Sequence, residues 1–130
     1  MPVLAAFDYA VVRVVPRVER EEFINVGVIV HAPTLAYLGC RIEPDLDRLA
    51  AFAPGLDLGG LVATLAGFGR VCAGERDAGP IAALPRVERF HWLVAPRSAV
   101  IQVSPVHGGM CADPAAALDE LFARRVAYPP

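Results

Sequence analysis

The alternation of apolar and polar positions in the first third of the chain predicts three β-strands. Residues 7–15, 24–31 and 35–42 are rich in Val, Ile, Tyr and Leu, which favour extended structure. Residues 7–15 are apolar on both alternating faces except at Asp8 and Arg13, a pattern typical of a central strand. The short turn at residues 32–34 predicts that the second and third strands form an antiparallel hairpin.

Apolar residues spaced by three and four positions predict three helices. The first opens at Asp45 and stops at Pro54. The second follows Asp57, and the third follows Asp113. Asp57 and Asp113 can each accept a hydrogen bond from a backbone N–H of the first turn, so we expect them to cap their helices.

Two more strands are predicted at residues 87–94, which carry Phe90 and Trp92, and at residues 99–104. Glycine and proline within residues 73–85 predict an exposed loop before them. The order of elements indicates an α+β fold, in which residues 1–130 form a single domain. We expect a mostly antiparallel sheet of about five strands with about three helices packed on it.

Composition narrows the classes of partner. The formal net charge is −2, so bulk charge does not favour binding to nucleic acid or membranes. The three cysteines are far apart and have no C-x-x-C spacing, which argues against a disulfide framework or a zinc site. The first residues lack the basic and apolar regions of a signal peptide. We therefore expect a cytoplasmic protein that holds no metal and no cofactor.

One candidate site lies between the first two strands. Arg13 interrupts an apolar row, and Glu22 and Asn25 follow in the connection and the second strand. If the second strand alternates regularly, Asn25 and Gly27 lie on one face together with Ile29 and His31. Residues 24, 26, 28 and 30 then form the other face. An arginine near a carboxylate, beside an amide and a glycine, can build a small polar pocket. In the alternative interpretation Arg13 pairs with a glutamate and these groups only specify packing.

A second candidate site lies in the stretch from Arg97 to His107. Ser98, Gln102 and Ser104 alternate with apolar residues, so they share one face of a strand. Such a row can hydrogen-bond a ligand, and Arg97 can bind a phosphate or carboxylate bidentately. A solvated sheet face has the same pattern, which leaves both interpretations open.

His107 is the weak candidate for acid–base catalysis, because the pKa of a free histidine lies near neutrality. A loop residue before Gly108 and Gly109 is the alternative interpretation of this position. The chain contains no nucleophile elbow, phosphate-binding loop or dinucleotide-binding motif, each of which has a recognisable glycine spacing. The sequence alone therefore does not decide whether the protein is an enzyme.

These stretches resemble the bacterial family of unknown function DUF3037. The resemblance rests on residues 9–16, 20–30, 90–98 and 102–107, and it extends over nearly the whole chain. The family brings no established activity, so no residue inherits a catalytic role. Families of this kind are often encoded beside HipA-like protein kinases, and the resemblance therefore implies an accessory role beside a kinase-like partner.

Two functions are consistent with these features. The first is a non-catalytic interaction or accessory protein, which acts on a kinase-like partner or as a homodimer formed through an unpaired sheet edge. The second is a small enzyme or binder of an anionic ligand, such as a nucleotide or phosphate ester. In the second case Arg13 and Arg97 would hold the anion, while Asn25 and Gln102 would orient it.

Overall fold

In a computed structural model, which describes residues 3–97 and 99–127, five strands form one antiparallel sheet. The strand order is β3-β2-β1-β4, and β5 pairs with the first half of β1 on the same side as β4. β1 is therefore the central strand, as its two apolar faces predict. The strands are β1 (Ala5–Val14), β2 (Ile24–Ala32), β3 (Tyr37–Ile42), β4 (Ile101–Val103) and β5 (His107–Cys111).

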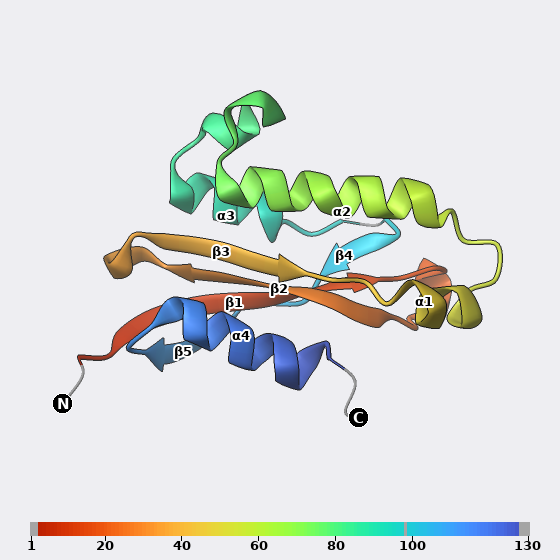
Figure 1. Cartoon of the computed structure of the whole chain (residues 1–130), viewed down its shortest axis with the longest axis horizontal. Coiled ribbons are helices and arrows are strands. Elements are labelled where there is room, and N and C mark those ends of the chain that lie inside the picture. The colour runs from red at the N-terminus through yellow and green to blue at the C-terminus, as the bar shows by residue number, and fades with distance from the viewer. Residues whose placement is uncertain (1–2, 98, 128–130) are drawn as a thin grey trace.

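Helices cover both faces of this sheet (Figure 1). α2 and α3 lie on one face, α4 lies on the other, and α1 lies at one end. The described residues thus form a single α+β domain, with four helices where the sequence predicted three. The helices are α1 (Leu46–Phe52), α2 (Leu58–Ala73), α3 (Arg86–Leu93) and α4 (Pro114–Arg125), and short 3₁₀ turns span Val18–Arg20, Pro33–Leu35, Arg76–Ala78 and Ile81–Ala83.

Aspartates begin three of the helices. The Asp57 carboxylate accepts a hydrogen bond from the Gly60 N–H at 3.0 Å, and the Asp113 carboxylate accepts one from the Ala115 N–H at 3.0 Å. Both predicted caps are confirmed. Asp45 caps α1 in the same way, so each of these helices satisfies one backbone donor that would otherwise have no intrahelical partner.

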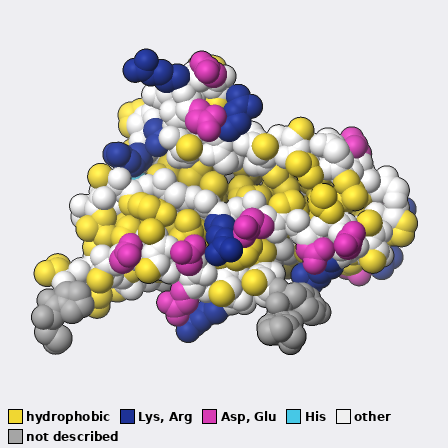
Figure 2. Space-filling model, viewed as in Figure 1, with side chains coloured by type: hydrophobic (Ala, Val, Ile, Leu, Met, Phe, Trp, Pro, Cys, Tyr) yellow, Lys and Arg dark blue, Asp and Glu magenta, His cyan; other side chains and the backbone are white. Residues whose placement is uncertain are grey.

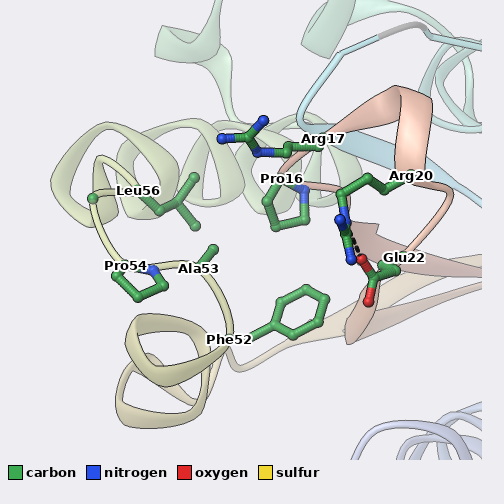
Figure 3. A pocket seen from close by; sticks show the side chains of 9 residues that line it. Pro16, Arg17, Arg20, Glu22, Phe52, Ala53, Pro54 and Leu56 are labelled. Carbon is green, nitrogen blue, oxygen red and sulfur yellow. Dashed lines mark hydrogen bonds and ion pairs between the residues drawn. The ribbon is translucent and has the colours of Figure 1, made fainter.

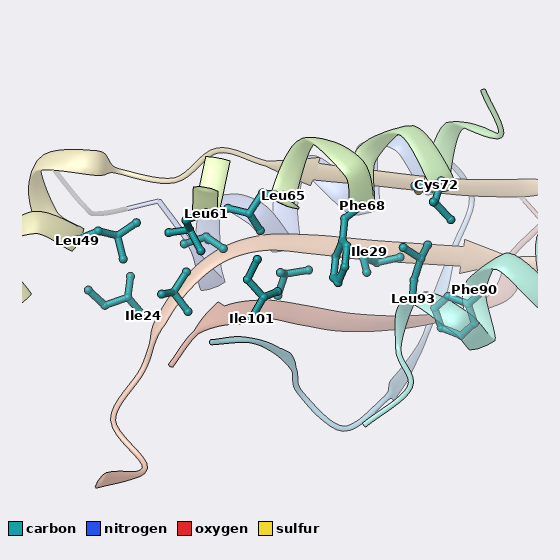
Figure 4. Packing of buried hydrophobic residues seen from close by; sticks show 14 of the residues in the cluster. Ile24, Ile29, Leu49, Leu61, Leu65, Phe68, Cys72, Phe90, Leu93 and Ile101 are labelled. Carbon is teal, nitrogen blue, oxygen red and sulfur yellow. The ribbon is translucent and has the colours of Figure 1, made fainter. Parts of the chain in front are cut away.

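Two apolar cores lie on opposite sides of the sheet. The larger core packs α1, α2 and α3 against the sheet through residues such as Leu49, Leu65 and Leu93 (Figure 4). The smaller core packs Leu118 and Phe122 of α4 against the other face. Both helix layers are therefore held by apolar burial, at roughly 25 cal/mol per Å² of apolar surface.

The predicted strand at residues 87–94 is wrong, because these residues form α3. Phe90 and Leu93 are both buried, and a spacing of three places two residues on the same side of a helix but on opposite faces of a strand. Pro85 precedes the first turn and Phe90 O accepts from the Val94 N–H at the end. The helical spacing thus outweighed the strand preference of Phe90 and Trp92.

The predicted strand at residues 99–104 is confirmed in part, and a further strand follows it that was not predicted. β4 covers part of the predicted strand at residues 99–104, whereas the expected turn around Gly108 and Gly109 is the middle of β5. A Cβ at Gly109 would lie 2.6 Å from Cζ of Phe7, so glycine lets the Phe7 ring lie over the strand. Within the expected loop at residues 73–85 there are two 3₁₀ turns, and the second contains the buried Ala82.

A β-bulge changes the predicted faces of β2. Val12 pairs with Gly27, but Arg13 pairs with Asn25, so Val26 is the additional residue. Asn25 therefore points to the α4 side while Gly27 points to the α2 side. The alternation predicted for residues 24–31 holds only on each side of this bulge.

Across the described residues, no helix combines the length and apolar character needed to cross a membrane.

Candidate functional site

A row of polar side chains crosses the sheet where β1, β2 and β4 meet. Arg13 in β1 lies opposite Asn25 in β2 and opposite Gln102 in β4. Directly opposed residues of antiparallel strands project from the same face. Asn25 donates a hydrogen bond from Nδ2 to the carbonyl of Arg125 in α4, at 2.9 Å, so this row lies on the α4 side.

Arg13 is half-buried without an acidic partner. No carboxylate among the described residues lies within 4.0 Å of its guanidinium. Its Cζ lies 3.9 Å from the centre of the Phe23 ring. Its Nε is buried and has no hydrogen-bond partner in the described part of the chain, and burial lowers the pKa of Arg13. The alternative interpretation, in which Arg13 pairs with a glutamate, is therefore wrong for the residues that the structure describes.

Asn25 adds an unpaired acceptor beside this donor. Its Oδ1 is buried and has no hydrogen-bond partner among the residues described. Arg13 Nε and Asn25 Oδ1 thus belong to neighbouring residues of one row, and each lacks a partner. Buried polar groups are almost always satisfied by protein, water or ligand, so each of these two atoms retains the capacity for one further hydrogen bond.

The row continues along the sheet through the end of α4. Arg125 donates from Nη2 to the Tyr9 hydroxyl at 3.2 Å. The Tyr9 ring lies 5.4 Å from the exposed His107 ring on β5. We define the polar sheet face by the side chains on this side of the sheet: Tyr9, Arg13, Phe23, Asn25, Gln102, His107 and Arg125.

The polar sheet face is extended and positively charged. Tyr9 and Arg13 are four residues apart on one strand, which separates them by about 13 Å at 3.3 Å per residue. Neither Arg13 nor Arg125 forms an ion pair within the described residues. Arginine binds carboxylates and phosphates through paired N–H donors. This geometry suits an extended anionic group more than a single small one.

Gln102 contributes a second amide to this face. Its Nε2 donates to the Ala99 carbonyl at 3.0 Å, which leaves its side-chain oxygen as an acceptor. Gln102 and Asn25 therefore flank Arg13 from its two neighbouring strands. The sequence predicted each of these residues, but only the strand order brings them together.

Glu22 lies apart from Arg13, in a groove of about 750 Å³ between the β1–β2 connection and the α1–α2 connection (Figure 3). It forms an ion pair with Arg20, and Arg17 lies 3.9 Å from Glu19. Phe52 supplies an aromatic wall. The arginines of this groove have acidic neighbours, so the groove has a weaker requirement for an external anion than the polar sheet face.

Arg97 lies on the opposite side of the sheet, against α3. Its guanidinium donates to the carbonyls of Leu93, Ala95 and Trp92 at 2.9, 3.1 and 2.8 Å. It also lies over the rings of Phe68 and Trp92, and burial lowers its pKa. Arg97 thus closes the C-terminal end of α3 and does not converge with Arg13. Ser98 lies outside the described residues.

Ser104 is buried where β4 gives way to β5. Its hydroxyl accepts a hydrogen bond from the Val11 N–H at 2.8 Å and donates to the Pro105 carbonyl at 2.9 Å. The hydroxyl therefore takes the place of a backbone carbonyl as the acceptor for Val11, at the point where the register with β1 changes between β4 and β5. Both of its hydrogen bonds are used within the fold.

Replacing Ser104 with alanine should lower the free energy of unfolding by about 1–3 kcal/mol, because the Val11 N–H would remain buried without an acceptor. Chemical denaturation measures this change. Thr64→Ala is the matched control, since the Thr64 hydroxyl is exposed, and it should change stability by less than about 0.5 kcal/mol. Equal effects of the two substitutions would contradict this role.

Sequence reasoning missed three contributors to the polar sheet face. Tyr9, Phe23 and Arg125 were not among the predicted site residues. The alternation of Tyr9 with Arg13 on one strand face was a signal for the first. No sequence signal places Arg125 beside Tyr9, because that contact spans 116 positions.

No cluster of three or more His, Cys, Asp or Glu side chains that could hold a metal ion occurs in the described residues. The amide, hydroxyl and guanidinium groups of the polar sheet face are suited to hydrogen bonding with anions rather than to metal ligation.

Comparison with known families matches residues 9–126 to the family described as "Protein of unknown function (DUF3037)". The matched region contains every residue of the polar sheet face. Searches of curated proteins and of solved structures gave no significant match.

Proposed function

Because the chain belongs to the DUF3037 family, whose description assigns no activity, we propose a function from its own surface: a non-catalytic interaction protein. The polar sheet face would bind an acidic segment of a partner protein. A HipA-like kinase in the bacterial cytoplasm is the candidate partner that the family resemblance suggests. The protein would then act as an accessory subunit rather than as an enzyme.

The single observation that carries this proposal is the half-buried Arg13 without a carboxylate partner. A partly desolvated charge is unfavourable unless it is paired and hydrogen-bonded. A carboxylate from a partner would pair with the guanidinium. Binding would therefore remove an energetic cost that the isolated chain retains.

The dimensions of the face support a protein partner. Arg13 and Tyr9 are about 13 Å apart along β1, a distance that an extended peptide of about four residues spans. The His107 ring lies against the Tyr9 ring, and no carboxylate in the described part of the chain forms an ion pair with His107, in contrast to the usual acid–base arrangement. These features favour recognition over catalysis.

Co-purification of tagged protein from its native host tests the proposal. Wild-type protein should recover a stable partner, and Arg13→Glu should reduce its recovery at least about tenfold, because loss of one member of a buried charge pair costs about 2–5 kcal/mol of binding energy. Arg17→Glu is the matched control, since Arg17 is exposed, and it should retain the partner.

Two outcomes would contradict this function. One is recovery of the protein alone together with turnover of a substrate by the purified chain. The other is equal loss of the partner in Arg13→Glu and Arg17→Glu, which would indicate a general charge effect rather than a specific contact.

A second candidate function is binding of a small anionic ligand, such as a nucleotide or phosphate ester. The Arg13 guanidinium, which forms no ion pair among the described residues, supports it because a guanidinium binds a phosphate through paired N–H donors. A ligand at millimolar concentration should raise the melting temperature of wild-type protein but not of Arg13→Gln. No shift with nucleotides or phosphorylated metabolites would count against this alternative.

A further inference from the structure

β3 has one edge that no strand of the described chain covers. Its pairing with β2 follows one register, and the Glu43 N–H donates to the Val26 carbonyl at 2.9 Å. Backbone groups of an antiparallel strand alternate in direction. Residues 37, 39 and 41 therefore bond to β2, whereas the N–H and C=O groups of Leu38, Cys40 and Ile42 point away from the sheet.

This edge forms the floor of an apolar groove. α2 contributes Val62, Ala66 and Gly69, and β3 contributes Cys40 and Ile42, to a cavity of about 390 Å³. Figure 2 shows hydrophobic side chains gathered along this side of the molecule, between α2 and α4. An edge with unsatisfied backbone groups and apolar surroundings is a template for another strand.

We propose that the strand that binds this edge is β3 of a second copy of the chain. The two strands would run antiparallel about a twofold axis at Cys40, and the two sheets would become one continuous sheet. Leu38 would pair with Ile42 of the second copy, and Cys40 with Cys40. Every outward N–H and C=O of these residues would then have a backbone partner.

The side chains of β3 are self-complementary in this register. Leu38, Cys40 and Ile42 all pack toward the α2 core, so apolar residues would lie opposite apolar residues on that side. On the α4 side Arg41 would lie opposite Gly39 of the second copy. Like charges directly opposite each other destabilise a sheet, and this register avoids that arrangement.

The helix above the edge leaves room for the second copy. Ala66 and Gly69 of α2 face the groove, and Arg41 is held on the other side by Glu43 and Asp119 at 2.7 and 3.4 Å. Small residues allow two helices to approach closely. The pairing of Arg41 within its own chain keeps its side chain on the α4 side, away from the apolar groove.

Sedimentation and amide hydrogen exchange test this proposal on the wild-type chain. At high concentration the mass should be about twice 13.8 kDa, and the amides of Leu38, Cys40 and Ile42 should exchange slowly. On dilution to monomer these amides should exchange at least about tenfold faster. The amides of Gly39 and Arg41, which bond to β2, should remain protected throughout.

Substitution at Cys40 provides the matched pair. Cys40→Pro removes an outward N–H without removing a bond to β2, so it should yield a monomer with the circular dichroism of the folded chain. Cys40→Ala keeps the N–H and should remain dimeric. If Cys40→Pro fails to fold, Ala66→Glu, on the exposed surface of α2, tests the same interface and should also be monomeric.

Three results would overturn the proposal. The first is a monomer at every concentration with rapid exchange at Cys40. The second is a dimer that persists in both Cys40→Pro and Ala66→Glu, which would place the interface elsewhere. The third is a monomer whose Cys40 amide becomes protected only when a different protein is added. None of these measurements depends on Arg13, so they are independent of the proposed function.

Discussion

Gly27→Ala is expected to destabilise the protein by about 2–3 kcal/mol, because the added methyl group overpacks the junction of β2 and β3. A Cβ at Gly27 would lie 2.7 Å from Cγ1 of Ile42 and 2.9 Å from the Arg41 carbonyl oxygen. The carbonyl belongs to a strand held in the β2–β3 ladder, so it cannot move without loss of pairing. The free energy of unfolding from urea titration measures the effect.

Gly67→Ala is the matched control for this prediction. A Cβ at Gly67, within α2, would meet no atom within 4 Å, and alanine favours helix over glycine by about 0.8–1.0 kcal/mol. The same chemical change should therefore stabilise at Gly67 and destabilise at Gly27. If both substitutions changed the free energy of unfolding in the same direction, or each in the opposite direction to that expected, the close approach of β3 to Gly27 would be contradicted.

Arg97→Ala is expected to destabilise by about 3 kcal/mol, since hydrogen bonds to charged groups contribute about 1.5–3 kcal/mol each and are not additive. The substitution leaves the carbonyls of Trp92, Leu93 and Ala95 without this donor. It also removes the contact with the Trp92 ring. Because Trp92 is the only tryptophan, its fluorescence should report the change at α3 directly.

Arg124→Ala provides the control for loss of an arginine. Arg124 is exposed and, among the described residues, forms an ion pair with Glu120 alone, at 3.1 Å in α4, so its loss should change stability by less than about 1 kcal/mol. If Arg97→Ala leaves stability and Trp92 fluorescence unchanged but abolishes binding of an anion, then Arg97 is a binding residue and the structural role assigned to it is wrong.

The sequence predicted the elements whose signals are local. The first three strands carry repeated β-branched residues, and the caps at Asp57 and Asp113 need only the adjacent turn. α3 was mistaken for a strand because Phe90 and Trp92 favour strands, although the spacing of Phe90 and Leu93 is helical. Tertiary packing decided between these two local preferences.

The bulge at Val26 shows a different limit. Nothing in residues 24–31 announces an additional residue, and its position depends on how β2 pairs with β1. The bulge places Asn25 and Gly27 on opposite faces of the sheet, whereas regular alternation predicts that both lie on the same face. Asn25 thereby contributes to the polar sheet face. Gly27, which has no side chain, allows β3 to lie close to β2 on the other face.

The candidate site was predicted in its residue types but not in its assembly. Arg13, Asn25 and Gln102 form one row only because β1 lies between β2 and β4, and strand order is not written in local sequence. Arg97 and Ser104 had the same polar character, yet both are used to satisfy backbone groups. Arg13 differs from Arg97 because its buried Nε has no hydrogen-bond partner among the described residues.

The most direct test of the polar sheet face is an amide hydrogen-exchange footprint of the protein in complex with its co-purified partner. Protection is expected around Arg13, Gln102, His107 and Arg125, on the strands and helix end that form the face. Protection confined to the groove beside Phe52, with no change around Arg13, would contradict the proposed binding surface.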